Sequence, residues 1–115
     1  VIIWADNRSI AQTEKLKQED IARNLYMRTG SPIHPVSVLT KLIWLREKKP
    51  EIFHQAAKFI SIKEYIFWRL FQRYVVDYSI ASAAGLFNLK QLDWDAEALT
   101  IAGITREQLS ELVPT

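Results

Sequence analysis

The sequence contains no cysteine among its 115 residues. Disulfide bonds and thiolate metal sites are therefore excluded, and this composition is typical of a reducing compartment such as the cytoplasm. Glycine is scarce, with only three residues, so no glycine-rich loop that cradles phosphate groups can be assembled. No apolar run reaches the roughly 20 residues that a membrane-spanning helix needs. We expect a cytoplasmic protein without a membrane partner.

An excess of charge of one sign is also lacking, because 15 lysines and arginines are balanced by 13 aspartates and glutamates. The densest basic cluster, at residues 46–49, contains a glutamate and is followed by Glu51. Opposite charges so close together largely cancel beyond a Debye length, so we expect no nucleic-acid partner. The two histidines, His34 and His54, lie far apart without an HExxH spacing, and a zinc site is not predicted.

Hydrophobic periodicity and capping residues predict a mainly α chain. The capping box Ser9–Gln12 predicts the start of a first helix. A second, amphipathic helix should end at Gly30, which can adopt the left-handed stop conformation. Two prolines make residues 31–37 an extended loop. A third helix should end before Pro50, which suits the first turn of the next helix, and apolar residues continue at helical spacing to Ile60.

Two further capping boxes predict helices in the second half of the chain. Ser61–Glu64 begins a helix that should run through Phe71. This helix is apolar almost all round, so we expect it at the centre of the core. If its Trp68 ring is buried there, Trp68→Ala should cost about 3–5 kcal/mol. Thr105–Gln108 begins a last helix, which Pro114 should stop.

Two short segments are predicted to be extended. The apolar run Val1–Trp4 indicates a buried strand, whose partners must come from elsewhere in the chain or from residues outside it, and we favour residues outside it. Tyr74–Val76 is too short and too β-branched for a helix. No repeat or linker divides the chain. We therefore expect residues 1–115 to form a single helical subdomain with one or two short strands.

No motif of a self-contained enzyme is present. A G-x-S-x-G nucleophile elbow is absent, and no serine has a histidine and an aspartate marked out as partners. Most carboxylates stand among lysines and arginines on predicted helix faces, as is typical of solvated surfaces. Paired-acid catalysis therefore cannot be argued from the pattern.

Several blocks of the sequence resemble the FGGY carbohydrate kinases. The strongest is Asp77–Leu89, which reads DYSIASAAGLFNL and is closed by Leu92–Asp95. Trp4–Arg8 looks like the family's motif of tryptophan, any residue, aspartate, any residue, arginine. Thr40–Glu47 is similar to the lysine, apolar, any residue, tryptophan core of its first signature. The order and spacing of these blocks agree along nearly the whole chain, which is identified as a member of the family.

The resemblance implies that residues 1–115 are a fragment of the N-terminal, sugar-binding domain, within an actin-like or ribonuclease-H-like α/β kinase fold. It implies transfer of the γ-phosphoryl group of ATP, with Mg²⁺, to a hydroxyl of a sugar or sugar acid. The family's phosphate-binding hairpin, catalytic base and nucleotide-binding domain match no residues here. We therefore expect this fragment alone to be inactive and to bind neither ATP nor Mg²⁺, with the remainder of the kinase as its partner.

Within the family, the wording of Trp4–Ser9, residues 31–35 and Ser61–Phe67 looks most like bacterial gluconate kinases, and xylulose kinases come next. Val36 stands where glycerol-type members place an aromatic residue, which argues against a glycerol kinase. Val36 and Val38 also depart from the Met and Pro that gluconate-type members often show, so the first signature is matched incompletely.

Three residues are candidates for sugar binding. The resemblance places Trp4 and Asp6 in the family's sugar pocket, and an indole face and a carboxylate suit the C–H and hydroxyl groups of a polyol. His34, in the proline-stiffened loop, could face a sugar acid as a donor or a cation. The alternatives are that Trp4 is a core residue, that Asp6 caps a helix or pairs with Arg8, and that His34 is an exposed loop residue. Lys41 is expected to be architectural.

A function from another class stays open. The predicted Val1–Trp4 strand and the apolar helical surface could serve a helical interaction module that associates with itself and has no catalytic activity. A homo-oligomer that shows no response to sugar would favour this alternative.

Overall fold

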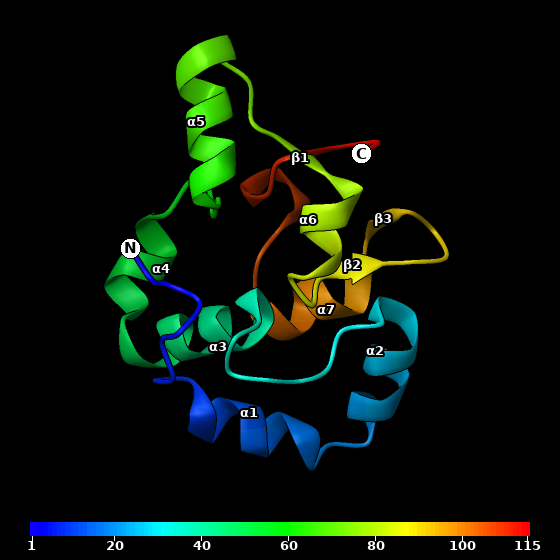
Figure 1. Cartoon of the computed structure of the whole chain (residues 1–115). Coiled ribbons are helices and arrows are strands. Elements are labelled where there is room, and N and C mark those ends of the chain that lie inside the picture. The colour runs from blue at the N-terminus through cyan, green and yellow to red at the C-terminus, as the bar shows by residue number, and fades with distance from the viewer.

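The computed structural model describes residues 1–115 and is mainly helical (Figure 1). Its helices are α1 (Ile10–Lys17), α2 (Ile21–Thr29), α3 (Val38–Lys48), α4 (Pro50–Gln55), α5 (Ile62–Phe71), α6 (Tyr78–Ser82) and α7 (Ala96–Ala102), with the 3-10 helix η1 (Arg106–Gln108). The strands are β1 (Val75–Asp77), β2 (Phe87–Asn88), β3 (Asp93–Trp94) and β4 (Glu111–Val113). The mainly α fold class is confirmed.

The strands form two separate pairs. β1 and β4 are parallel, with Val76 opposite Leu112. β2 and β3 are antiparallel, with Phe87 opposite Trp94. The parallel pair brings the C-terminal segment alongside the middle of the chain, as Figure 1 shows. The prediction of an extended segment at Tyr74–Val76 is thus confirmed, within one residue at each end.

The core lies around α3 and α7, which cross the middle of the molecule in Figure 1. Leu39, Leu42 and Ile43 of α3 are buried there, together with the ring of Phe87, which is 1% exposed. Trp94 packs edge-on against Phe87, with 6.3 Å between ring centroids. α1 and α2 cover the lower side of this core in the figure, whereas α5 projects from the upper side. No helix is long and apolar enough to cross a membrane.

Several local signals act as the sequence predicts. Ser61 and Glu64 form a complete capping box at the start of α5. Gly30 ends α2 in the left-handed conformation, at φ 66°. Pro50 occupies the first turn of α4, directly after α3 ends. Residues 31–37 form a loop without regular structure. Each of these features depends on residues within a few positions, which is why the sequence alone can predict it.

The predicted strand at Val1–Trp4 does not form within this chain, and its pairing with residues outside the chain stays a prediction. These residues have no regular structure, and Val1, Ile3 and Trp4 are exposed. A strand needs a neighbour that satisfies its backbone groups, and no other segment of this chain pairs with it. The apolar run therefore stays on the surface in this structure.

The prediction that the helix through Phe71 is central to the core is also wrong. Ile62, Leu70 and Phe71 of α5 are 71%, 69% and 62% exposed. Trp68 is half-buried and stacks on Tyr74, with 5.8 Å between ring centroids. The condition for a cost of 3–5 kcal/mol on Trp68→Ala is therefore not met. α5 packs mainly on β1, and no second layer covers its other side.

One cap and two helix boundaries differ from the prediction, although the first helix starts where Ser9 predicts it. Ser9 precedes α1 but makes no capping bond, because its hydroxyl donates to the Pro35 carbonyl instead. α4 ends at Gln55, and the predicted continuation to Ile60 is wrong because Gln108 bonds to the backbone of Ala56 and Phe59. The Thr105–Gln108 box is present, but it starts only the single turn η1 before β4. In the last two cases pairing with a distant segment replaces the local helix.

Candidate functional site

Two segments that are distant in sequence meet at the N-terminal end of α3. They are residues 4–8 and the loop 31–37. The Lys41 Nζ donates hydrogen bonds to the carbonyl oxygens of Pro35 at 2.7 Å, Asp6 at 3.2 Å and Trp4 at 3.4 Å. Burial lowers the pKa of Lys41, against the smaller, opposing influence of the Asp6 carboxylate. One ammonium group therefore joins both segments to α3.

A shared group of hydroxyls strengthens this junction. The Ser9 Oγ lies 3.2 Å from the Pro35 carbonyl and 3.4 Å from the Thr40 Oγ1. The Thr40 Oγ1 in turn donates to the His34 carbonyl at 2.9 Å. Ser9 and Thr40 are almost fully buried, so these bonds hold the loop backbone in a place from which water is excluded.

Asp6 forms a tight ion pair with Arg8. The Arg8 Nη2 lies 2.6 Å from the Asp6 Oδ2, and the Arg8 backbone N–H donates to Oδ1 at 3.0 Å. The Arg8 side-chain and backbone hydrogen bonds lower the pKa of Asp6 to about 2. Asp6 is therefore ionised at neutral pH. The alternative in which Asp6 pairs with Arg8 is confirmed, and the pairing fixes the direction of the Asp6 carboxylate.

Arg8 is held in turn by α3. Its guanidinium carbon lies 4.5 Å from the centroid of the Trp44 ring, in cation–π geometry. Trp44 therefore orients the Asp6–Arg8 pair as well as packing in its own helix. This role was not foreseen from the sequence, although both aromatic and basic residues stand in the two blocks that carry the family resemblance.

Trp4 and His34 are both exposed. The indole of Trp4 is 77% exposed, so the alternative that it is a core residue is wrong. The His34 Nδ1 accepts a hydrogen bond from the Val36 N–H at 3.1 Å, which leaves Nε2 as the donor of the neutral ring. Lys41 joins the segments that carry Trp4, Asp6 and His34, and their contact with a sugar stays a prediction.

The Asp77–Leu89 block contacts the first turn of α3, the helix that carries Lys41. The Leu39 N–H, in the first turn of α3, donates to the Ala84 carbonyl at 3.1 Å. Gly85 follows at φ +76°, and a Cβ at this position would lie 3.3 Å from the Leu39 Cβ. A side chain is strained in that conformation and crowds the start of α3. The strongest block of the resemblance thus acts through packing.

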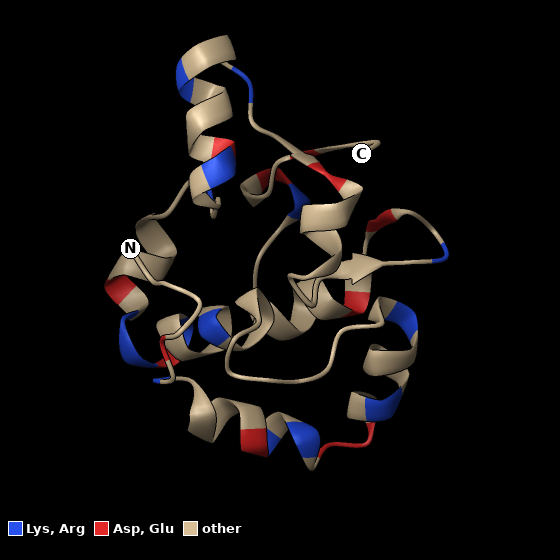
Figure 2. Ribbon diagram, viewed as in Figure 1, with Lys and Arg blue, Asp and Glu red and all other residues tan.

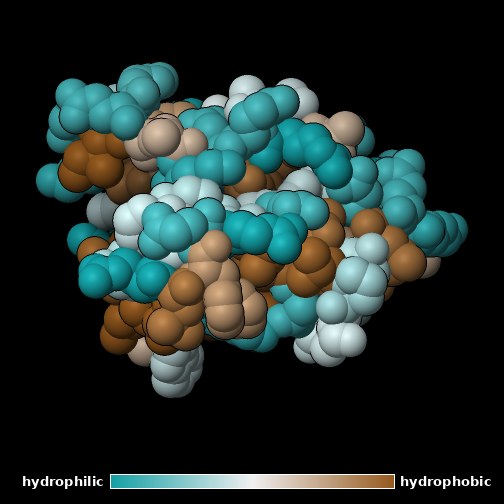
Figure 3. Space-filling model, turned by 90° about the horizontal axis from the view of Figure 1, so that it is seen from above, coloured by the Kyte–Doolittle hydropathy of each residue, from teal (hydrophilic) through white to brown (hydrophobic).

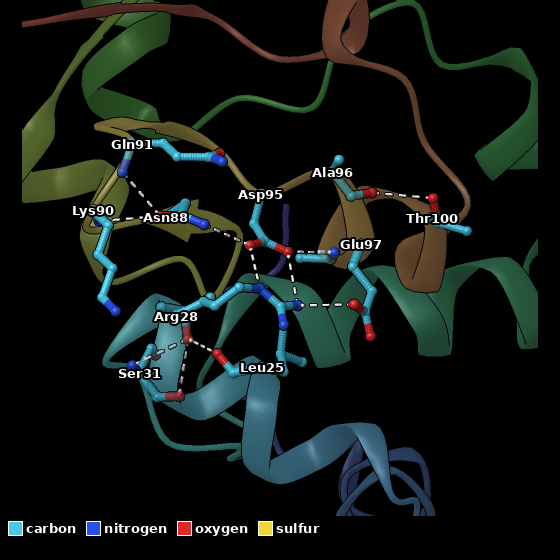
Figure 4. Close-up of polar contacts among 12 residues, drawn as sticks. Leu25, Arg28, Ser31, Asn88, Lys90, Gln91, Asp95, Ala96, Glu97 and Thr100 are labelled. Carbon is cyan, nitrogen blue, oxygen red and sulfur yellow. Dashed lines mark hydrogen bonds and ion pairs between the residues drawn. The ribbon is translucent and has the colours of Figure 1, made fainter.

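A second polar network joins α2 to α7 (Figure 4). The Arg28 Nε donates to the Asp95 Oδ2 at 2.7 Å, and the Asn88 Nδ2 donates to the same oxygen at 3.0 Å. Asp95 also caps α7 by accepting from the Ala98 N–H at 2.9 Å. Burial acts to raise the pKa of Asp95, but these hydrogen bonds outweigh it and lower the pKa. The network serves the architecture, since the Asp95 side chain is buried, with 3% of its surface exposed.

The residues of this chain do not fit a magnesium–nucleotide complex. No group of three or more His, Cys, Asp or Glu side chains is placed to hold a metal ion. The three glycines lie in separate turns.

A hollow of about 730 Å³ beside β3, β4 and η1 is lined by none of Trp4, Asp6 and His34. In the view of Figure 2, basic and acidic residues are interspersed along the ribbon.

Comparison with known proteins places the chain in a family. All of residues 1–115 match the N-terminal domain of the FGGY family of carbohydrate kinases. A gluconokinase of Bacillus licheniformis is 58% identical over 99% of this chain, which spans 22% of that protein. Crystal structures of a gluconate kinase and a ligand-bound xylulose kinase from Lactobacillus acidophilus each give a TM-score of 0.93 at 44% identity, over 97% of this chain and 23% of theirs. This chain belongs to the FGGY family of carbohydrate kinases.

Proposed function

We propose that this chain is part of a kinase that transfers the γ-phosphoryl group of ATP to a hydroxyl of a sugar or sugar acid. Gluconate is the favoured substrate and xylulose the next. The observation that carries the proposal is the 58% identity to a gluconokinase over 99% of the chain. The chain spans only about a fifth of that protein, so the activity belongs to the whole enzyme, and the isolated fragment is expected to be inactive.

In this proposal, Trp4, Asp6 and His34 contribute one wall of the sugar pocket within the N-terminal domain. The exposed indole of Trp4 offers an apolar face for sugar C–H groups. The ionised Asp6, oriented by Arg8, accepts hydroxyl hydrogen bonds. The His34 Nε2 donates to a hydroxyl or to a sugar carboxylate. These groups bind and orient the acceptor, and none of them performs the phosphoryl transfer.

ATP and Mg²⁺ would be held by parts of the kinase outside this chain. When bound, ATP supplies the phosphoryl group and Mg²⁺ neutralises its developing charge. The residues described here only hold the acceptor hydroxyl in position, and we assign them no further step. Because ATP is produced and used in the cytoplasm, the proposal places the enzyme there.

The test is ATP consumption by the full-length kinase with gluconate, xylulose, ribulose and glycerol, measured by coupled detection of ADP. We expect gluconate to give the highest kcat/KM. Asp6→Ala should lower kcat/KM for gluconate by about 100-fold, because it removes a charged acceptor from the pocket. Glu14→Ala is the matched control, since Glu14 is an exposed carboxylate on α1 that pairs only with Lys17.

Turnover of no polyol or sugar acid would refute the kinase assignment. Turnover that Asp6→Ala leaves unchanged would refute the proposed wall of the pocket and leave the kinase assignment intact. Cooperative thermal unfolding of each variant separates loss of binding from loss of structure.

A second candidate function is self-association, favoured by the apolar surface of α5. Figure 3 looks down on the end of the molecule from which α5 projects, where hydrophobic residues reach the surface. A large contiguous apolar surface is unusual unless a partner covers it. We favour the remainder of the kinase chain as the partner. Concentration-dependent association of the isolated chain, unaffected by gluconate, would support self-association instead.

A further inference from the structure

Lys41 has an unusual set of partners for a lysine. Its ammonium group donates to three backbone carbonyls, at 2.7, 3.2 and 3.4 Å, and takes part in none of the salt bridges of the structure. An ammonium group has three N–H donors, so this arrangement satisfies all of them. The side chain is therefore used as a three-way connector between backbone segments.

The three carbonyls belong to the two segments that carry the proposed sugar-binding residues. Trp4 and Asp6 lie 37 and 35 positions before Lys41 in the sequence, and Pro35 lies next to His34. Lys41 itself projects from α3, whose neighbouring residues Leu42 and Ile43 are buried in the core. The connector is thus anchored on a rigid element.

The two segments do not depend on Lys41 equally. The loop is also held by the hydrogen bond from Thr40 to the His34 carbonyl and by that from Ser9 to the Pro35 carbonyl. By contrast, the carbonyls of Trp4 and Asp6 accept a hydrogen bond from Lys41 alone. Without this lysine, Trp4 would lose its hydrogen bond to α3, and Asp6 would be tied to that helix only through its chain neighbours, by Arg8 on Trp44 and by Ser9 on Thr40.

We propose that Lys41 is a positioning residue that sets the place of Trp4 and Asp6 relative to His34, and thereby the affinity of the kinase for its sugar. This inference rests on the proposed function of those three residues. Lys41 contacts no substrate in this proposal. It acts by holding the backbone from which the binding side chains extend, and small displacements of such groups have large effects on binding and rate.

The test is steady-state kinetics of the full-length kinase with Lys41→Met, which keeps the apolar stem and removes all three donors. We expect the KM for gluconate to rise about ten-fold or more, whereas the KM for ATP changes by less than about two-fold. Lys17→Met is the matched control, because Lys17 is an exposed lysine paired with Glu14, and it should change neither KM. A lower melting temperature with an unchanged gluconate KM would show that Lys41 is only structural and would overturn the proposal.

If the Lys41→Met variant does not fold, Lys41→Arg tests the same proposal. A guanidinium retains the charge and several donors, so this variant should fold, but its planar fork cannot reach three carbonyls in the same arrangement. A gluconate KM raised at least about three-fold, with the ATP KM unchanged, is expected; a wild-type gluconate KM overturns the proposal.

Asp6→Asn, measured beside these variants, separates this inference from the proposed function. If Asp6→Asn raises the gluconate KM and the Lys41 variants do not, the positioning role alone is refuted. If neither Asp6→Asn nor the Lys41 variants change the gluconate KM, both the assignment of Asp6 to the pocket and the positioning role of Lys41 are refuted.

Discussion

At the scale of single residues, the candidate site combines an ion pair between sequence neighbours with contacts between residues that are distant in the sequence. Asp6 pairs with its sequence neighbour Arg8, but Arg8 is oriented by Trp44, and the backbone around Asp6 is held by Lys41. The local ion pair can be predicted from the sequence. The two long-range contacts cannot be predicted, because they form only when α3 lies beside the N-terminal segment.

The Asp6–Arg8 pair predicts a specific dependence of stability on pH. Arg8 lowers the pKa of Asp6 from its ordinary 3.8 to about 2. A lowered pKa in the folded state stabilises the fold above the unfolded value, and this contribution is lost as the pH falls toward the folded value. We expect the stability difference between wild type and Asp6→Asn to be constant above about pH 5 and to narrow between about pH 4 and 2.

Urea unfolding of the full-length kinase at pH 6, 4 and 3 measures this difference. Lys17→Met serves as a reference for general effects of acid, since it alters an exposed surface pair away from the site. A difference that does not change with pH would mean that Asp6 has the same pKa in both states, contrary to the geometry.

The Asp95 network predicts a large loss of stability. Its side chain is 3% exposed and receives hydrogen bonds from Arg28, Asn88 and the α7 backbone. Asp95→Ala leaves Arg28 without its main partner and α7 without its cap, so we expect a loss of about 3 kcal/mol in the free energy of unfolding. Chemical denaturation is the measurement.

Glu97→Ala is the matched control for this prediction. Glu97 also pairs with Arg28, at 3.2 Å, but its side chain is 45% exposed. Exposed ion pairs contribute little, so this change should cost less than about 1 kcal/mol. Equal costs for the two variants would contradict the view that burial and capping give Asp95 its importance.

At the scale of elements, α5 shows how a strong local signal can leave the tertiary position open. Its capping box forms as predicted, and its composition suggests a core helix. In the structure its apolar side chains are largely exposed. Capping is satisfied within one turn of helix, whereas burial requires a partner surface, and this chain supplies one on a single side only.

The exposed face of α5 predicts different responses in the isolated chain and in the full-length kinase. Leu70 and Phe71 are 69% and 62% exposed. Replacing both by glutamine should change the stability of the isolated chain by less than about 1 kcal/mol, as expected for surface positions. If the remainder of the kinase covers this face, the same change should destabilise the full-length protein by about 3 kcal/mol or more.

Thermal and urea unfolding of both proteins test this prediction, and sedimentation of the isolated chain shows whether the glutamines also suppress association. Replacing Arg69 and Gln72, which flank the pair and are exposed, by alanine is the control. An unaffected full-length kinase would show that this face is not covered by the rest of the enzyme.

At the scale of the whole molecule, the chain matches about a fifth of the gluconokinase that it resembles. The turnover experiment therefore needs the full-length protein, in which a nucleotide site outside this chain would complement the proposed sugar wall. The separate strand pairs are consistent with this view, because a parallel pair such as β1–β4 normally forms part of a larger, covered sheet.

The sequence by itself determined the family, the mainly α character and the local stop and start signals at Gly30, Pro50 and Ser61. These properties depend on motifs and on contacts within a few residues. Only the tertiary structure decided that Val1–Trp4 is not a strand within this chain, that α5 lies at the surface, and that Lys41 joins both parts of the candidate pocket. Each of these outcomes depends on which distant segments come together, and spacing along the chain does not encode that directly.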